Sequence, residues 1–328
     1  MTALVLTAGG ARGAYQAGVM KRISEIPAFV DQAAPFSIIT GASAGAINGA
    51  AIASQHDNFG VASKLLVKLW ASLEANNVYR SDAFAMMKNA ASLALDFGLG
   101  GLVGAGRVKS LVDSSPLYAF LNQNLKLDGI RRAVKEGGLY ALGITATGYH
   151  TGRAFTFVEG KPGHPLWSKS RRVALPAEIT LPHVLASAAI PIVFPPVELP
   201  AGAASAFFGD GAMRLVTPLS PAIRLGADRL LAVGVRCQES ANSLLRSEWS
   251  QDADFAPNLK RPPLSQICGT LMNAIFLDHL DSDLDHLKRM NSFVAEHEKL
   301  ASLVDLVAES DSDHEPMRIV TPLVISPS

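Results

Sequence analysis

The length, composition and charge of the chain exclude several classes of protein. Its 328 residues are 48% hydrophobic and only 18% charged, so the chain can bury a large core and is not expected to be disordered. Its 29 basic and 29 acidic side chains give a formal net charge of zero, which argues against a broad nucleic-acid-binding surface and leaves uncharged or zwitterionic substrates open.

The cysteine content and the first residues predict a cytoplasmic protein. Cys237 and Cys268 are too few for a disulfide framework, and we expect both thiols to be reduced. The N-terminus lacks a basic segment followed by a cleavage site, so we expect no signal peptide. The longest apolar segment, residues 90–105, is interrupted by Asp96 and is too short to cross a membrane. No cysteine and histidine cluster has zinc spacing, and we expect neither a metal nor a cofactor.

A buried strand and a glycine-rich turn are predicted at the start of the chain. Residues 3–7 form an apolar run, and the turn over residues 8–13 leads into a helix with an apolar face. Such an arrangement can begin a dinucleotide site, but Ala8 occupies the first glycine position of that fingerprint. No acidic residue ends a second strand about 20 residues later, where the ribose contact would require one. A nicotinamide site is therefore not favoured.

The same turn is better suited to binding an anion. Gly9 and Gly10 have no side chains to block their backbone N–H groups, and such a concave backbone binds negative charge. If the first strand lies beside the strand that ends at Gly41, these N–H groups can form an oxyanion hole. Arg12 adds a positive charge to the turn, with a surface salt bridge as the alternative interpretation.

The second apolar run ends in Gly41-Ala42-Ser43-Ala44-Gly45, and a helical segment of small residues follows. This is the layout of a nucleophile elbow, in which a strained turn between strand and helix exposes a serine hydroxyl. The two glycines allow the strand and the helix to pack closely, and the helix start directs N–H groups toward an oxyanion. Ser43 is therefore a candidate nucleophile, although a serine at a helix start is also a common N-cap.

The middle of the chain alternates between helices and strands. Helices are predicted over residues 58–74, 115–125 and 181–189, and a pair of strands over residues 139–147 and 154–158. Residues 79–108 are rich in glycine and apolar side chains, so we expect a mobile apolar covering over the site, with a plain core segment as the alternative. Ser187 is a second small-residue hydroxyl, which we expect only to pack.

Asp210 is the second chemical landmark. The apolar run over residues 206–208 delivers it into a turn flanked by Gly209 and Gly211, where its carboxylate can meet another loop. An ordinary Asp-Gly turn is the alternative interpretation. A helix over residues 217–225 and a strand over residues 229–235 follow.

The composition changes after this strand. Residues 237–263 are polar and read as a linker or long loop, residues 264–303 as a helix, and residues 318–325 as a final strand. The predicted apolar face of the helix comprises Ile267, Leu271, Ile275, Leu280, Leu284, Leu287 and Phe293. Its polar residues are interpreted as a solvated face rather than a metal site, and they are His279, Asp281, Asp283, Asp285 and His286.

Taken together, four motifs resemble those of the patatin-like phospholipase family and occur in the family's order over about residues 3–236. They are Gly9-Gly10-Ala11-Arg12-Gly13, Gly41-Ala42-Ser43-Ala44-Gly45, Ala186-Ser187-Ala188-Ala189-Ile190-Pro191 and Asp210-Gly211-Ala212. Ala8 departs from the pattern, because the family often has a glycine there. The resemblance implies a three-layer α/β/α fold with a mostly parallel central sheet. It also implies a catalytic domain over residues 1–236, with residues 264–328 as a C-terminal extension packed on the core.

The activity implied by the resemblance is that of a lipid acyl hydrolase of the phospholipase A, lysophospholipase or carboxylesterase type. Ser43 would attack the ester carbonyl, Asp210 would act as the general base, and Gly9 and Gly10 would hold the oxyanion. The partners would be a lipid or ester substrate and a transient membrane surface, without nucleic acid. The supporting residues would be Arg12, Gly13, Gly41, Gly45 and Gly211.

Three other interpretations stay open at this point. An α/β-hydrolase orders serine, acid and histidine along the chain, and four histidines follow Asp210, namely His279, His286, His297 and His314. None of them sits in a short loop after a strand, where a triad histidine belongs. The chain could also be a non-catalytic lipid-binding protein on the same scaffold, or an enzyme that transfers the acyl group to an acceptor other than water.

Overall fold

The computed structural model describes residues 1–80, 110, 112–201, 204–236, 263, 267, 269–270, 279–304 and 318–327. Nearly all of the predicted covering segment (79–108) and of the predicted linker (237–263) lies outside these residues, as do both cysteines.

The described strands form one sheet with a parallel centre. Five neighbouring strands run parallel in the order β10 (Thr321–Ile325), β9 (Arg229–Val233), β1 (Thr2–Leu6), β2 (Ile38–Ala42) and β3 (Ala141–Gly148). β4 (Arg153–Gly160) is antiparallel to β3 across the predicted turn, and β6 (Arg172–Pro176) and β5 (Ser168–Lys169) continue the sheet. A hairpin of β7 (Val197–Ala201) and β8 (Ala204–Asp210) branches from β3.

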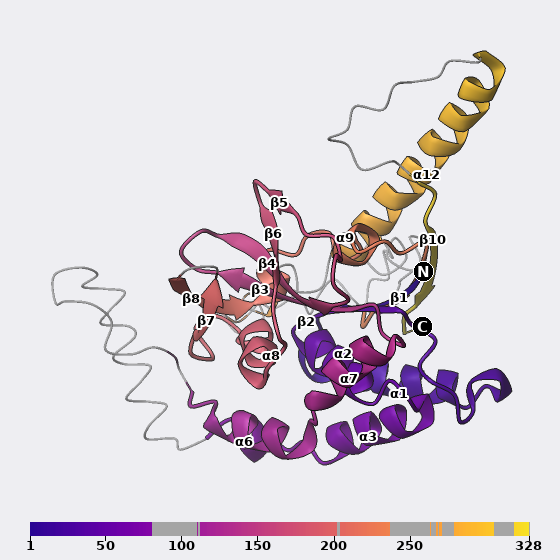
Figure 1. The fold of residues 1–328 in the computed structure, drawn as a ribbon. Helices are drawn as coiled ribbons and strands as arrows, with labels where there is room; N and C mark the ends of the chain where they lie inside the picture. Colours follow the sequence, from indigo (N-terminus) through magenta and orange to yellow (C-terminus); the bar gives the residue numbers. More distant parts are fainter. Residues whose placement is uncertain are drawn as a thin grey trace, which may run out of the picture.

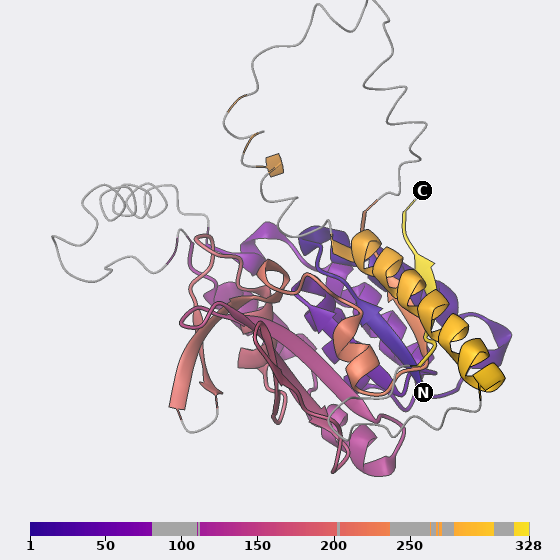
Figure 2. The ribbon, with the colours of Figure 1, turned by 90° about the horizontal axis from the view of Figure 1, so that it is seen from above.

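Helices cover both faces of the sheet (Figures 1 and 2). One layer contains α1 (Gly13–Ser24), α2 (Ala44–Ser54), α3 (Phe59–Ala71), α7 (Asp128–Glu136) and α8 (Leu181–Ala188), with α4 (Ala75–Val78) and α6 (Ser115–Asn124) beside them. The opposite layer contains α9 (Ser220–Arg224) and α12 (His279–Val304). The predicted three-layer α/β/α fold with a mostly parallel central sheet is confirmed. None of the described helices combines the length and the apolar character needed to cross a lipid bilayer.

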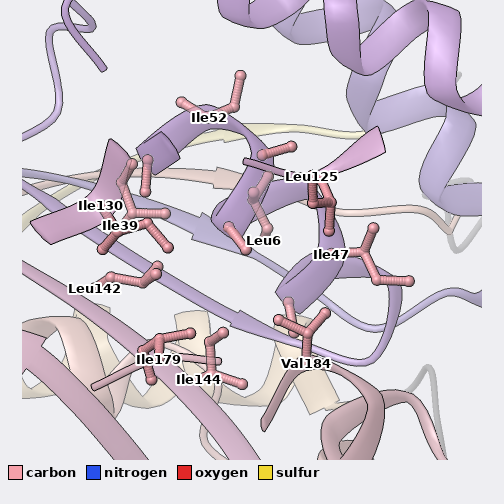
Figure 3. Packing of buried hydrophobic residues seen from close by; sticks show 14 of the residues in the cluster. Leu6, Ile39, Ile47, Ile52, Leu125, Ile130, Leu142, Ile144, Ile179 and Val184 are labelled. Carbon is pink, nitrogen blue, oxygen red and sulfur yellow. The ribbon is translucent and has the colours of Figure 1, made fainter. Parts of the chain in front are cut away.

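The two faces of the sheet explain why the first strand is a continuous apolar run. Leu4 and Leu6 belong to the larger core cluster on the α2 side, whereas Ala3 and Val5 belong to the cluster under α9 and α12. Because side chains alternate along a strand, a strand buried on both faces shows no polar position. Figure 3 shows the larger cluster, in which Leu6 of β1 lies near side chains of α2.

The first strand lies beside the strand that ends at Gly41, which is the arrangement that the predicted oxyanion hole requires. Leu6 pairs with Gly41, so both strands end at the same edge of the sheet. The glycine turn after β1 and Ser43 after β2 therefore emerge next to each other.

Two expectations about the predicted helix over residues 264–303 are wrong, and Leu271 and Ile275 of its predicted apolar face lie outside the described residues. Phe293 is 53% exposed and Ile267 is 52% exposed, so neither belongs to a buried face. Leu280, Leu284 and Leu287 are buried as expected, and Val294 continues their stripe, because it lies seven residues after Leu287 on the same side of the helix. Phe293 lies one residue earlier, about 100° around the helix from Val294.

Asp283 also differs from expectation, since it is buried instead of solvated and accepts a hydrogen bond from the Leu219 N–H at 2.8 Å. It thereby ties α12 to the start of α9. In the described part of the chain, no group of three or more histidine, cysteine, aspartate or glutamate side chains could hold a metal ion.

Some elements were not predicted at all. The helix α7 has only nine residues, most of them polar, and buries Gly129, Ile130 and Ala133. The strands β5, β6 and β7, which lie at or next to the margins of the sheet, are short and lack the strong apolar runs of the central strands.

Substituting Gly45 by alanine is expected to destabilise the fold by about 2 kcal/mol or more, because a Cβ there would lie 2.1 Å from the Leu6 carbonyl oxygen. Gly18 is the matched control, since it lies in α1 and a Cβ added there would have no neighbouring atom within 4 Å. Gly18→Ala is expected to stabilise the protein by about 0.5–1 kcal/mol. Urea unfolding of both variants measures the difference, and equal midpoints would contradict the close packing of the elbow.

Candidate active site

The turn that carries Ser43 is strained and tightly packed. Ser43 has φ = 55° and ψ = −126°, a backbone conformation that residues with a side chain rarely adopt. The helix and strand approach so closely that a Cβ at Gly41 would lie 2.3 Å from the Gly45 carbonyl oxygen. Only glycine fits at these two positions, and their packing holds the serine in its strained conformation.

The hydroxyl of Ser43 points to Asp210. Its Oγ donates a hydrogen bond to Asp210 Oδ2 at 2.7 Å, and its side chain makes no capping hydrogen bond to α2. The N-cap interpretation therefore does not describe this serine. Two loops separated by 167 residues in sequence converge at this contact.

Asp210 ends β8 and has an exposed fraction of zero. Its other carboxylate oxygen, Oδ1, accepts a hydrogen bond from the Ala212 N–H at 2.9 Å, so both oxygens have partners. Its carbonyl oxygen accepts the hydroxyl of Thr147 at 2.8 Å. A Cβ at Gly211 would lie 2.0 Å from the Thr145 carbonyl oxygen, so glycine is required for the turn to pack against β3.

Burial makes this carboxyl group an unusual one. Loss of contact with water disfavours the charged form and raises the pKa of Asp210 to about 7, although the hydrogen bonds from Ser43 and Ala212 act in the opposite direction. Tyr149 packs beside the preceding residue, because a Cβ at Gly209 would lie 2.2 Å from the Tyr149 hydroxyl oxygen. Burial, and next the negative charge of Asp210, raise the pKa of Tyr149. An aspartate that titrates near neutral pH can exchange a proton with a hydroxyl group more readily than an ordinary one.

The glycine turn lies beside the elbow. A Cβ at Gly13 would lie 2.8 Å from the Cβ of Ala44, the residue that follows Ser43. Gly10 has φ = +54° and open space around it. The backbone hydrogen bonds within the turn are donated by Arg12 and Gly13, so within the described residues the N–H groups of Gly9 and Gly10 have no protein acceptor.

Arg12 is exposed at the end of this turn, and no salt bridge to it is found among the described side chains. The expected alternative of a surface ion pair is therefore not seen in this part of the chain.

A buried polar network that the sequence analysis missed braces the glycine turn. Gln16 donates to the Thr7 carbonyl oxygen at 2.9 Å, and Asn48 donates to the Gly13 carbonyl oxygen at 3.0 Å. Asn48 also donates to Gln16 and accepts from the Trp70 indole. The end of the turn is thereby fixed directly to α2, and its start is fixed to α2 through Gln16 of α1. The available signal was an amide side chain among the small and apolar residues of each of two predicted helices, and both amides are buried in the structure.

Ser187, expected only to pack, lies against the elbow and accepts a hydrogen bond from the backbone N–H of Ser43 at 3.0 Å.

The histidines do not join the pair. Among the described residues, no histidine forms a hydrogen bond with Ser43 or Asp210. His279 lines a cavity of about 30 Å³ that Ala212 also lines, and His314 lies outside the described residues. The buried His183 caps α8, where its Nδ1 accepts the N–H of Thr180, and burial lowers its pKa to about 4.

Comparisons with known proteins bear on this arrangement. A family model described as Patatin-like phospholipase matches residues 4–223. Among solved structures, the chain is similar to VipD from Legionella pneumophila, with 15% identity, a TM-score of 0.37, and coverage of 76% of this chain and 53% of that chain. It is also similar to a structure of full-length SpcU in complex with full-length ExoU from the type III secretion system of Pseudomonas aeruginosa. There the identity is 18%, the TM-score is 0.24, and the coverage is 49% of this chain and 35% of that chain. The chain thus spans about half the length of the first of these structures. No curated protein matches the chain.

Asp210→Asn is expected to stabilise the protein at pH 8. There the wild-type carboxyl is ionised in both states, and the raised native pKa makes ionisation costly by about 1.4 kcal/mol per pKa unit, a few kcal/mol in total. The gain should shrink as the pH falls below about 7, and little of it should remain at pH 4, where the unfolded carboxyl, with its ordinary pKa of 3.8, is itself partly protonated. Urea unfolding between pH 4 and 8 measures it. The exposed Asp285 serves as the control in an Asp285→Asn variant, and a gain independent of pH would contradict the assignment.

Proposed function

Because the chain belongs to the patatin-like phospholipase family, we propose that it cleaves carboxylic ester bonds of lipids with Ser43 as the nucleophile and Asp210 as the general base. Family membership implies lipid acyl hydrolase activity, whereas the residues and the mechanism belong to the proposal. The observation that carries it is the 2.7 Å hydrogen bond between the Ser43 hydroxyl and a fully buried carboxyl group.

In the first half of the reaction, ionised Asp210 accepts the hydroxyl proton of Ser43 while the Ser43 oxygen attacks the ester carbonyl carbon. The C–O bond to the leaving alcohol then breaks, the alcohol takes the proton from Asp210, and an acyl-enzyme forms. In the second half, Asp210 accepts a proton from water, and the resulting attack releases the fatty acid and returns the proton to Ser43. The pKa of about 7 supports this role, because a base is most effective when its pKa is near the working pH.

The oxyanion that forms at each tetrahedral stage needs hydrogen-bond donors. The N–H groups of Gly9 and Gly10 are the proposed donors, because they lack protein acceptors in the described residues and their turn packs against the residue after Ser43. Each such donor is typically worth about 3 kcal/mol of transition-state stabilisation. The exposed Arg12 next to them adds a positive charge that favours the oxyanion or a substrate phosphate.

Direct contact between serine and carboxylate favours a dyad over a triad, because a triad requires a histidine between the two groups. The hydrolase and acyltransferase alternatives share the acyl-enzyme, and they differ only in the acceptor that attacks it. Product analysis with glycerol or a lysolipid present separates them.

Ser43→Ala and Asp210→Asn are expected to lower the hydrolysis of p-nitrophenyl esters and phospholipids by about 10³-fold or more, since each removes one partner of the proton transfer. Initial rates on both substrate classes measure the loss, and labelling by a fluorophosphonate probe should disappear in Ser43→Ala. The matched control is His279→Ala, which should retain wild-type rates. A non-catalytic lipid-binding protein would bind lipid without being labelled, and loss of activity in the histidine variant would favour a triad.

The rate should also depend on pH in a way that reports Asp210. The base is active only when it is ionised, so kcat/KM should fall as the pH drops through about 7 and should level off above it. Assays between pH 5 and 9, with a return to pH 8 to exclude denaturation, measure this acid limb. A limb at pH 4–5, where an ordinary carboxylate titrates, would contradict a buried base.

A further inference from the structure

The motif Ala186–Pro191 has a place in the fold that the proposed chemistry does not yet use. It contains the last turn of α8, and this turn lies between the two loops that carry the catalytic residues. The neighbouring residues of the turn are small, which allows it to approach both loops.

One residue of this turn holds the nucleophile. Ser187 has an exposed fraction of zero, and its Oγ donates a hydrogen bond to the Thr145 carbonyl oxygen at 2.6 Å. Because the hydroxyl proton is used in this way, the oxygen is left as an acceptor, and it accepts the Ser43 N–H at 3.0 Å. The hydroxyl of Ser187 therefore joins the elbow to β3.

Two residues further on, the same turn holds the base. The carbonyl oxygen of Ala189 accepts the backbone N–H of Asp210 at 2.8 Å. One short segment thus binds the backbone N–H groups of both catalytic residues. The backbone strain at Ser43 makes this important, because a strained turn relaxes when the contacts that hold it are removed.

We propose that Ser187 is a positioning residue, an inference that rests on the proposed function. Ser187 fixes the backbone of Ser43, so that the Ser43 hydroxyl stays within hydrogen-bond distance of Asp210. It touches neither substrate nor reacting atoms. Its effect is on the geometry of the proton transfer, and so on kcat, with little effect on substrate binding.

The experiment compares Ser187→Ala with the control Ser63→Ala. Ser63 is also fully buried, and its hydroxyl bonds to Ser24 and to the Gly60 carbonyl in α3, away from the two loops. For each variant, kcat is divided by the number of sites that a fluorophosphonate probe titrates, so that loss of folded protein does not count as loss of rate. KM and the acid limb of the pH profile are measured for the same variants.

In Ser187→Ala, kcat per titrated site should fall by on the order of 10- to 100-fold, because a displacement of about 1 Å can cost that much, and KM should change little. The acid limb should move to higher pH, since the hydrogen bond from Ser43 lowers the pKa of Asp210 and would be weakened. Within the part of the chain that the structure describes, Tyr149 is the titratable group whose pKa responds to the charge of Asp210, and the substitution leaves it unchanged. Ser63→Ala should keep the wild-type kcat per site and acid limb.

Wild-type kcat per site and an unmoved acid limb in Ser187→Ala would overturn the inference. If that variant does not fold, Ser187→Cys is tested instead, because a thiol of similar size is only a weak hydrogen-bond acceptor. A wild-type kcat per site in Ser187→Cys would equally overturn the inference. Ser43→Ala and Asp210→Asn are assayed in parallel. If these two retain activity, the proposed function and this inference fall together. If they are inactive while Ser187→Ala is fully active, only the role of Ser187 falls.

Discussion

The centre of the molecule depends on one hydrogen bond between a strained serine and a carboxyl group removed from water. Neither state is favourable by itself, since the Ser43 backbone conformation costs energy and burial disfavours the charge of Asp210. The surrounding fold supplies the compensation through the close packing at Gly41, Gly45 and Gly211. Ser43 and Asp210 therefore lie at a place where the close packing leaves the scaffold little room to relax.

The topology explains how residues far apart in sequence reach this point. Parallel strands end at a common edge, and in open α/β sheets the ligand sites lie at the carboxyl ends of the strands. The turn after β1 and the elbow after β2 follow this rule. Asp210 reaches the site from a strand of the opposite direction. It ends β8, which runs antiparallel to β3, and it pairs with Ala146 of β3. A hairpin added to the parallel sheet thus brings in the residue proposed as the base.

The central strands, the elbow and the two catalytic candidates could be predicted because their signals are local. An apolar run that ends in Gly41-Ala42-Ser43-Ala44-Gly45 specifies strand, turn and helix within a few residues. The motif order led to the patatin-like resemblance, and the family match confirms it.

The roles of Ser187, Gln16 and Asn48 could not be predicted in the same way. Their partners include backbone groups that only the tertiary fold brings near, such as the Ser43 N–H and the Thr7 carbonyl oxygen. The exposure of Phe293 was missed for a related reason. The apolar residues of this helix can be grouped into more than one possible buried face. Which face is buried depends on how α12 packs on the rest of the protein.

The capping histidine of α8 has a consequence for how the molecule responds to acid. His183 accepts the Thr180 N–H through a ring nitrogen that must be unprotonated, and with a pKa of about 4 it stays neutral throughout the physiological range. Mild acidification therefore protonates Asp210, whose pKa is about 7, while α8 keeps its first turn intact. Under the proposed mechanism, mild acid would stop the reaction reversibly by protonating Asp210, at a pH where the His183 cap of α8 is still in place.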